Sequence, residues 1–332
     1  MPKILSLMPK IYFKDPGTLA TLETFKDDLA FSTDYEPSQI IAAAKDATCL
    51  LCPAPYPIIS EEVMKALPNL KLIQTAGAGY DKIDLDAAAK AGIPVANTPG
   101  LNTLAAAELA LAAIIVLRRR FVYADREIKR GQYQPAREKL LAQGMSEVNG
   151  SRWGIIGLGR IGAKLAEAGK VLGAEVSYYD PFRRTEAEEK QLGVNFRNLE
   201  EILTTNDVIV ICVALTEETK GLIGSREMNM MQPGAILINM ARGGIVDDTA
   251  LAESLAQEHL GGAALDTFEI EPLPADHPLL TLPEEVKDRL FLTPHLAGVT
   301  KQALNRMLEY ALANCARVLK GEQPVAVVNG VE

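Results

Sequence analysis

The amino-acid sequence predicts an α/β protein built from two doubly wound parallel-sheet domains. Short apolar runs alternate with longer helical patterns along the chain, which is typical of repeated strand–helix–strand units. Runs such as VIVIC and AILIN are apolar on both faces, as expected for central parallel strands that helices cover on both sides. The chain has 332 residues, and this is more than one hydrophobic core usually serves.

The predicted strands are apolar runs bounded by turn residues; they cover residues 3–8, 47–54, 70–77, 153–159, 174–180, 207–214, 235–240, 261–266 and 289–294. The predicted helices cover residues 38–45, 61–67, 103–130 and 160–172. Ser60 is the predicted N-cap of the second helix. A break in NTPGLNT marks a domain boundary near residues 99–102. The long helix after it is rich in Ala, Leu and Ile, which fits either core packing or an oligomer interface.

The charge and the cysteine pattern exclude several function classes. The formal net charge is −9, so the surface repels nucleic-acid phosphates and anionic lipids, and we expect neither as a partner. No apolar run has membrane-spanning length, and the N-terminal run is too short for a signal peptide, so the expected location is the cytoplasm.

Cys49 and Cys52 have C-x-x-C spacing, but ATCLLCPAP resembles a buried strand, which places them on opposite faces. We therefore expect neither a redox pair nor a metal site.

The segment WGIIGLGRIG contains a G-x-G-x-x-G pattern at Gly157, Gly159 and Gly162. An apolar strand precedes it and a helical pattern follows, which is the setting in which this pattern binds a dinucleotide. The first glycine permits a tight turn, the second lets the backbone approach a pyrophosphate, and the third lets the helix pack closely on the strand. The helix N-terminus then offers amide groups and a positive dipole end to the phosphates.

Asp180 ends the next predicted strand. A carboxylate at this position accepts hydrogen bonds from the ribose hydroxyls and repels a 2′-phosphate, so we expect NAD rather than NADP as the cofactor. Arg183 and Arg184 leave the NADP alternative open, because arginines can hold a phosphate. We interpret these two arginines as a solvated charged turn.

Three histidines limit the choice of a catalytic imidazole. His259 lies between a predicted helix and a strand, and we interpret it as a surface or capping residue. His277 lies in the polar loop PADHPLL. His295 follows RLFLTP at the carboxyl end of a strand, where α/β sheets bind ligands. It is the best candidate, with a structural histidine at a strand end as the alternative.

Two further strand ends carry charged residues. Arg242 follows AILINM, and a guanidinium there can bind a planar carboxylate through two parallel hydrogen bonds. A structural arginine in a loop is the alternative. The strand GGAALD and the loop after it carry Asp266, Glu269 and Glu271, and spacing alone does not choose among these carboxylates. A cation, an acid and an imidazole at one sheet edge suit proton transfer coupled to hydride transfer.

The chain resembles the D-isomer-specific 2-hydroxyacid dehydrogenase family over nearly its whole length. The resemblance lies in the segments AGAGYDKIDLDAAAKAGIPVANTPG (76–100), GIIGLGRIG (154–162), NMARGGIVDDTAL (239–251), ALDTFEIEP (264–272) and TPHLAG (293–298). It implies an oxidoreductase that moves a hydride between NAD(H) and a small 2-hydroxy or 2-oxo acid. It also implies that a Rossmann-type NAD-binding domain, residues 102–298, is inserted into a flavodoxin-like substrate domain made of residues 1–101 and 299–332.

The resemblance also implies roles for individual residues. The implied catalytic residues are Arg242, Glu271 and His295, and Glu271 is preferred to Glu269 because the family's acid precedes the proline of F-E-x-E-P. The implied cofactor-binding residues are Gly157, Gly159, Arg160, Ile161, Gly162, Asp180, Thr216, Ala241, Asp266, His295 and Gly298. The implied substrate-binding residues are Gly77, Ala78, Gly79, Arg242 and His295, and we expect Tyr80, Leu101 and Asn102 in the pocket.

In the expected reduction, the Gly77–Gly79 amides and Arg242 hold the 2-oxo acid. His295 donates a proton to the forming alkoxide, and Glu271 stabilises the charged imidazole. The resemblance further implies a homodimer formed through the helix after Asn102. Two other functions remain open, an NAD-sensing corepressor-like binding protein and a phosphonate-oxidising enzyme. The sequence does not choose among glyoxylate, hydroxypyruvate, lactate-type and larger acids as the substrate.

Overall fold

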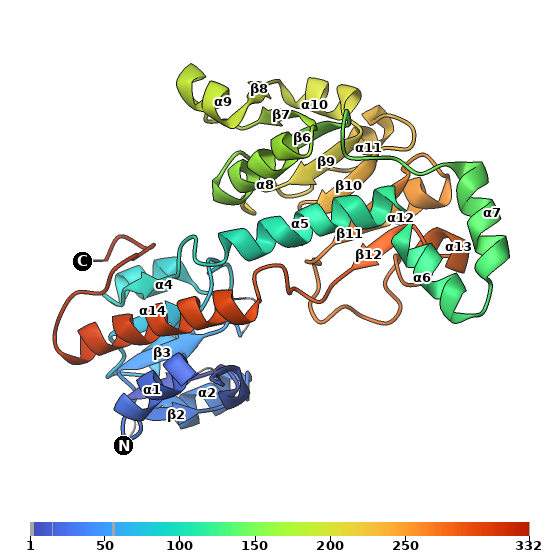
Figure 1. Ribbon diagram of the computed structural model, residues 1–332. Coiled ribbons are helices and arrows are strands. Elements are labelled where there is room, and N and C mark those ends of the chain that lie inside the picture. The colour runs from blue at the N-terminus through green and yellow to red at the C-terminus, as the bar shows by residue number, and fades with distance from the viewer. Residues whose placement is uncertain (1–2, 15, 55–56, 332) are drawn as a thin grey trace. The chain divides into compact units, whose positions relative to one another are not determined.

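The computed structural model describes residues 3–14, 16–54 and 57–331 (Figure 1). The chain divides into two compact units, Met1–Asn102 with Gly298–Glu332 (unit 1) and Thr103–Ala297 (unit 2). Among the described residues, no helix combines the length and the apolar character needed to cross a membrane.

Unit 1 is a five-stranded parallel sheet covered by helices. Its strands are β1 (Ile4–Ser6), β2 (Leu29–Phe31), β3 (Cys49–Cys52), β4 (Leu72–Thr75) and β5 (Val95–Ala96). Its helices are the 3₁₀ helix η1 (Lys10–Tyr12), α1 (Pro16–Thr24), α2 (Pro37–Ala44), α3 (Glu61–Lys65), α4 (Leu85–Lys90) and α14 (Lys301–Leu319). The strand order β2-β1-β3-β4-β5 confirms the predicted flavodoxin-like arrangement.

Alternate residues of the unit 1 strands pack on opposite faces of the sheet. On β3, Leu51 packs in the cluster that contains Leu308 of α14, whereas Leu50 packs in the cluster that contains Ile40 of α2. Both faces of the strand are therefore apolar, which is why the sequence shows a continuous apolar run there.

The cysteines of β3 occupy the two faces of the sheet that the strand prediction requires. Cys49 packs in the cluster with α14, and Cys52 packs in the cluster with α2 and α3. Both are free thiols, and burial raises the pKa of Cys52 to about 12, which makes it a poor nucleophile or ligand. Within the described parts of the chain, no group of three or more His, Cys, Asp or Glu side chains is placed to hold a metal ion.

Unit 2 is a seven-stranded parallel sheet covered by helices. Its strands are β6 (Arg152–Ile156), β7 (Glu175–Tyr179), β8 (Val194–Phe196), β9 (Val208–Ile211), β10 (Ile236–Asn239), β11 (Gly262–Leu265) and β12 (Leu290–Leu292). Its helices are α5 (Thr103–Arg118), α6 (Phe121–Lys129), α7 (Tyr133–Gln143), α8 (Arg160–Val171), α9 (Glu186–Leu192), α10 (Leu199–Thr205), α11 (Ser225–Met230), α12 (Asp248–Ala256) and α13 (Glu284–Lys287).

The strand order of unit 2, β12-β11-β10-β9-β6-β7-β8, confirms the predicted Rossmann arrangement. The order reverses between β6 and β9, and ligands of such sheets bind beside this point, at the carboxyl ends of the strands. On β9, Ile209 and Ile211 pack with helices α10 to α12, while Val208 and Val210 pack with α5 and α8. The run VIVIC is apolar on both faces for this reason.

The prediction of one helix over residues 103–130 is wrong. Helix α5 ends at Arg118, and α6 begins after Arg120, whose φ of 54° is left-handed and interrupts the helix. The segment contains neither proline nor glycine, so the sequence offers no signal for this break. Ser60 does occupy the N-cap of α3, but its side chain makes no capping hydrogen bond. The sequence does not predict strands β2, β5 and β8, which are only two or three residues long. It also does not predict helices η1, α1, α4, α7, α9, α10, α11 and α13.

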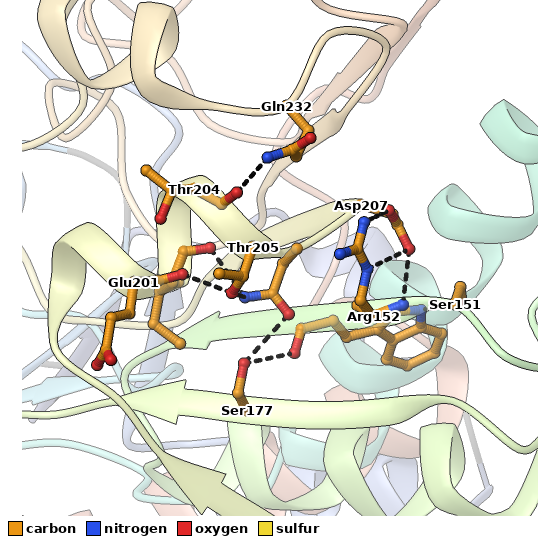
Figure 2. Close-up of polar contacts among 11 residues, drawn as sticks. Ser151, Arg152, Ser177, Glu201, Thr204, Thr205, Asp207 and Gln232 are labelled. Atoms are coloured by element: carbon orange, nitrogen blue, oxygen red, sulfur yellow. Dashed lines mark hydrogen bonds and ion pairs between the residues drawn. The ribbon is translucent and has the colours of Figure 1, made fainter.

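A polar network fixes the amino ends of the central strands of unit 2 (Figure 2). The Asp207 carboxylate accepts hydrogen bonds from the amide and the Nη2 of Arg152, at 2.9 Å and 2.6 Å. Ser177 of β7 donates to the carbonyl oxygen of Trp153 (3.3 Å) and to the side chain of Asn206 (3.1 Å). The network connects β6, β7 and β9 toward their amino ends, away from the edge of the sheet at which ligands bind in this fold.

We expect the variant Asp207→Ala to lose about 1 kcal/mol of folding free energy at pH 7, or roughly 2–4 °C in Tm, because the Arg152 contacts are partly exposed. Burial raises the pKa of Asp207, but its bonds to Arg152 outweigh this and lower the pKa below the usual 3.8. The ionised group therefore stabilises the fold above that value, and the effect is lost as the pH falls through the lowered pKa. Thermal unfolding at pH 7 and pH 3 checks this. A Tm difference that stays constant between the two pH values would contradict it.

Candidate active site

The predicted dinucleotide loop joins β6 to α8. Gly157 has a φ of 96°, and a Cβ there would lie 2.8 Å from the carbonyl carbon of Cys212. A Cβ on Gly162 would lie 2.3 Å from the carbonyl oxygen of Gly157, so glycine is required for this close packing of α8 on the strand. Gly159 is the N-cap of α8, and its Cβ position has nothing within 4 Å. A pyrophosphate fits this open helix N-terminus, where amide groups and the helix dipole favour negative charge.

Asp180 lies directly after β7 and braces the same loop. Its Oδ2 accepts a hydrogen bond from the amide of Leu158 (2.8 Å), and its Oδ1 accepts one from the amide of Phe182 (2.9 Å). The amide of Gly157 also donates to the carbonyl oxygen of Tyr179 (2.7 Å). The carboxylate is therefore fixed beside the glycine loop, where this fold places the ribose of a dinucleotide.

The two arginines after Asp180 lie in a largely exposed charged turn, and both also have protein partners. Arg183 donates two hydrogen bonds to the carboxylate of Glu189, at 2.9 Å and 3.0 Å. Arg184 donates to the carbonyl oxygen of Leu158 (2.7 Å), inside the glycine loop. Neither guanidinium is simply surrounded by water.

The predicted cation, acid and imidazole follow three adjacent strands of unit 2. Arg242 lies in the loop after β10, Glu271 in the loop after β11, and His295 in the loop after β12. Because all three strands are parallel, these loops leave the sheet at the same edge. This is the edge at which the glycine loop also lies.

Glu271 is the acid whose carboxylate reaches the imidazole. The Nδ1 of His295 lies 2.8 Å from Oε2 of Glu271, and Oε1 accepts a hydrogen bond from the amide of Phe268 (3.0 Å). Burial alone would raise the pKa of Glu271, but these two hydrogen bonds lower it below its usual value. The charge of Arg242 contributes in the same direction. The carboxylate therefore stays ionised beside the imidazole at neutral pH, whereas Glu269 is exposed.

The loop that carries His295 is held in an unusual conformation. His295 has a φ of 54°, in the left-handed region that non-glycine residues seldom adopt, and its amide donates to the carbonyl oxygen of Asp266 (2.8 Å). The Asp266 carboxylate accepts hydrogen bonds from the amides of Leu296 and Ala297, both at 2.7 Å. It also accepts one from the hydroxyl of Thr293 (2.5 Å). Burial raises the pKa of Asp266 against the opposing effect of these bonds. Asp266 thus anchors the imidazole loop, a role that the sequence did not reveal.

The loop that carries Arg242 is fixed from two sides. The side-chain amide of Asn239 donates to the carbonyl oxygen of Arg242 (2.8 Å), and its Oδ1 accepts from the amide of Ala241 (3.1 Å). A Cβ on Gly243 would lie 1.9 Å from the carbonyl carbon of Phe268, so the backbones of the arginine and acid loops touch there. The first glycine of ARGG is therefore needed for the two loops to meet.

The predicted substrate loop, Gly77–Gly79, follows β4 in unit 1. The amide of Thr98 donates to the carbonyl oxygen of Gly77 (3.0 Å), and the side chain of Asn97 donates to that of Ala78 (2.8 Å). In a trans peptide the N–H points away from the C=O, so the amides of the next residues, Ala78 and Gly79, point away from these partners. Such amides are the donors that a substrate carboxylate requires.

The other predicted site residues are spread over both units. Arg160 and Ile161 begin α8, and the amide of Thr216, in the loop after β9, donates to Thr219 Oγ1 (2.7 Å). Gly298 belongs to unit 1, where a Cβ on it would lie 2.4 Å from the side-chain nitrogen of Asn102. The chain therefore leaves and re-enters unit 1 at two residues in contact with each other. Of the remaining predicted pocket residues, Tyr80 packs against the unit 1 core, and the carbonyl oxygen of Leu101 accepts from Arg306 (2.9 Å).

The other two histidines have structural partners. The Nε2 of His259 lies 2.9 Å from the carbonyl oxygen of Met228, and the Nε2 of His277 lies 3.2 Å from Asp248 Oδ2. The ring of His277 packs edge-on against Phe268, with centroids 6.0 Å apart, and so supports the acid loop. Sequence reasoning missed this support, because a histidine in a polar loop gives no signal of what its ring contacts.

Known proteins resemble this chain over most of its length. Residues 111–297 match the family described as "D-isomer specific 2-hydroxyacid dehydrogenase, NAD binding domain". A glyoxylate reductase from Thermofilum pendens is 39% identical over 327 residues, which are 97% of this chain and 94% of that protein. A D-3-phosphoglycerate dehydrogenase from Archaeoglobus fulgidus is 42% identical over 245 residues, which are 74% of this chain and 44% of that protein.

Solved structures show the same architecture. The D-lactate dehydrogenase from Aquifex aeolicus, complexed with NAD and lactic acid, aligns with a TM-score of 0.83 at 29% identity and covers 96% of both chains. The family match, the near full-length relatives and the glycine loop of unit 2 agree with one another. The chain belongs to the D-isomer-specific 2-hydroxyacid dehydrogenase family and is an oxidoreductase that transfers a hydride between NAD(H) and a 2-hydroxy or 2-oxo acid.

Proposed function

We propose that this protein reduces a small 2-oxo acid, with glyoxylate as the first candidate, and that Arg242, Glu271 and His295 are its catalytic residues. The observation that carries the proposal is the 2.8 Å contact between His295 Nδ1 and Glu271 Oε2, at the sheet edge that also holds Arg242. Such a set supplies a proton donor, a carboxylate that stabilises its charged form, and a cation for the substrate's negative charge.

His295 is the general acid in reduction and the general base in oxidation. Its Nδ1 is bound to Glu271, so Nε2 is the nitrogen that exchanges a proton with the substrate oxygen. Glu271 fixes the plane of the ring and stabilises the imidazolium form. The lowered pKa of Glu271 supports this role, because the carboxylate keeps its charge across the working pH range.

Arg242 binds the substrate carboxylate and polarises the keto oxygen. A guanidinium presents parallel N–H groups that match a planar carboxylate. In unit 1, the carbonyl oxygens of Gly77 and Ala78 accept hydrogen bonds from Thr98 and Asn97, and we propose that the next two amides donate to a substrate carboxylate. In this way the keto carbon is held in place by groups that do not react.

Residues around β6 and β7 fit the cofactor. NADH, when bound, supplies the hydride that adds to the keto carbon. The open N-terminus of α8 at Gly159 would hold the pyrophosphate, and Asp180 would hold the adenosine ribose. Asp266 and Ala241, at neighbouring strand ends, are the residues that we assign to the nicotinamide side of the site.

The substrate proposal follows from the relatives. The Thermofilum pendens relative, matched almost end to end, is named a glyoxylate reductase, whereas the Archaeoglobus fulgidus protein is more than twice as long as the segment it shares. We therefore place glyoxylate before 3-phosphoglycerate-type substrates. We also propose that the hydroxy acid has the D configuration, in line with the family.

NADH oxidation with a panel of 2-oxo acids tests the proposal. We expect the highest kcat/KM with glyoxylate, lower values with hydroxypyruvate and pyruvate, and D-glycerate as the product of hydroxypyruvate reduction. L-Glycerate would contradict the stereochemical assignment. A chain that binds NADH but turns over no acid in the panel would instead be a binding protein, and phosphite-dependent NAD reduction would identify a phosphonate-oxidising type of enzyme.

We further propose that the protein is a homodimer formed through the helices after Asn102. Apolar side chains on α6 and α7 are exposed, including Phe121 (47%), Tyr133 (64%) and Leu141 (59%). So much exposed apolar surface on adjacent helices is typical of a surface covered by a second copy. Sedimentation equilibrium should give twice the monomer mass, and a monomer at micromolar concentration would contradict the proposal.

A further inference from the structure

Two arginines follow Asp180 in the loop after β7, and the first is engaged by a carboxylate of α9. Arg183 donates to both oxygens of Glu189, at 2.9 Å and 3.0 Å, and its guanidinium lies over the ring of Phe196, 5.1 Å from the centroid. Glu189 also accepts a hydrogen bond from the hydroxyl of Tyr178 (2.8 Å). The bonds from Arg183 and then Tyr178 lower the pKa of Glu189, so the pair is fully charged at neutral pH.

The second arginine is engaged by the glycine loop and by the same helix. Arg184 donates to the carbonyl oxygen of Leu158 through Nη2 (2.7 Å), and its Nη1 lies 3.3 Å from Oε1 of Glu188. The amide of Leu158 donates to Asp180, so one residue of the glycine loop bridges Asp180 and Arg184. Arg184 therefore lies close to Asp180, and Arg183 precedes it in the same loop.

Helix α9 thus determines the charge that a cofactor meets at this corner of unit 2. The helix lies beside β8 at one edge of the sheet (Figure 1). Two guanidinium groups face three carboxylates here, so the cluster has a net formal charge of −1. A 2′-phosphate, which needs free guanidinium groups, would meet paired arginines and an unpaired negative charge.

We propose that Glu189 is a specificity-determining residue: by holding Arg183 in a bidentate pair, it keeps this arginine from a 2′-phosphate and enforces the preference for NADH over NADPH. Asp180 repels the phosphate directly, and Glu189 removes the cation that would otherwise compensate for Asp180. Asp180, at the end of β7, and Glu189, on α9, thus both disfavour binding of the 2′-phosphate. This inference rests on the proposed cofactor site at the glycine loop.

The experiment measures dissociation constants of NADH and NADPH by titrating the fluorescence of the reduced nicotinamide, without substrate. The variant Glu189→Gln keeps an oxygen for the Tyr178 hydroxyl but removes the charge that holds Arg183. We expect it to tighten NADPH binding roughly fivefold, the gain from one partly exposed charge contact, and to change NADH binding less than about twofold. In an Asp180→Ser background, where the phosphate can approach, the gain from Glu189→Gln should be larger.

Two controls separate this proposal from a general charge effect. Glu175→Gln removes the same charge at the amino end of β7, the end away from the glycine loop, and should leave the ratio of the two dissociation constants unchanged. Adding Arg183→Ala to Glu189→Gln should abolish the gain in NADPH affinity, because the released arginine is the group that binds the phosphate.

The outcomes are distinguishable. An unchanged NADPH to NADH ratio in both Glu189→Gln backgrounds overturns the proposal. A gain that persists without Arg183, or that Glu175→Gln reproduces, overturns it as well. Failure of the unaltered protein to bind NADH would instead refute the cofactor site on which the inference rests. Thermal unfolding of each variant shows whether the protein remains folded.

Discussion

Replacing His295 with alanine should lower kcat for glyoxylate reduction by about 10²–10⁴. The imidazole is the proton donor of the proposed reaction, and its loop is held in place by Asp266, so alanine removes the donor and leaves its surroundings in place. No other described histidine can substitute, because His259 and His277 are bound to Met228 and Asp248.

His259→Ala is the matched control for this variant. His259 lies just before β11, at the amino end of the strand, and its ring contacts a backbone carbonyl rather than a charged group. We expect it to change kcat by less than about threefold, because it acts only on packing. If His295→Ala kept a kcat close to that of the unaltered enzyme, another group would have to donate the proton.

Replacing Arg242 with lysine should lower kcat/KM for glyoxylate by about 10²–10³, although the charge is kept. Lysine is a point charge on a flexible chain and does not present the two parallel N–H groups that match a carboxylate. Contacts at Asn239 and Gly243 fix the loop around this residue. The loop therefore cannot shift to let a lysine make the two parallel hydrogen bonds of the arginine.

Arg152→Lys is the matched control for the arginine variant. Arg152 pairs with Asp207 at the amino ends of the strands, so the same exchange should cost some stability and leave kcat/KM unchanged. Steady-state kinetics of Arg242→Lys at several glyoxylate concentrations separates the effect on kcat from the effect on KM. Kinetics that equal those of the unaltered enzyme would remove Arg242 from the substrate site.

The sequence predicts most strands of both sheets and the charged residues at the strand ends, because these depend on local signals. Runs such as VIVIC need only apolar residues on both faces. In the glycine pattern, the structure shows a steric need for glycine at Gly157 and Gly162. Strand ends can also be predicted from the sequence, since an apolar run that stops at a charged residue marks the edge of the sheet. Arg242 and His295 were found in this way.

The groups that position these side chains were not predictable, because each acts through a contact between distant segments. Asp266, at the end of β11, fixes the His295 loop that follows β12. Phe268, in the loop after β11, touches Gly243 in the loop after β10. The pairing of Arg183 with Glu189 likewise depends on how α9 folds back, so the arginines looked solvated in the sequence. The break between α5 and α6 arises from a left-handed arginine, which no residue type signals.

We propose that Glu271 acts through His295, and a double-mutant cycle of these two residues is the decisive experiment. Single-turnover oxidation of NADH by glyoxylate is measured for the unaltered enzyme, Glu271→Gln, His295→Ala and the double variant. We predict that Glu271→Gln slows hydride transfer by about tenfold or more in the unaltered enzyme and has no further effect once His295 is alanine. Losses that multiply in the double variant would contradict the account, because the two side chains would then act independently.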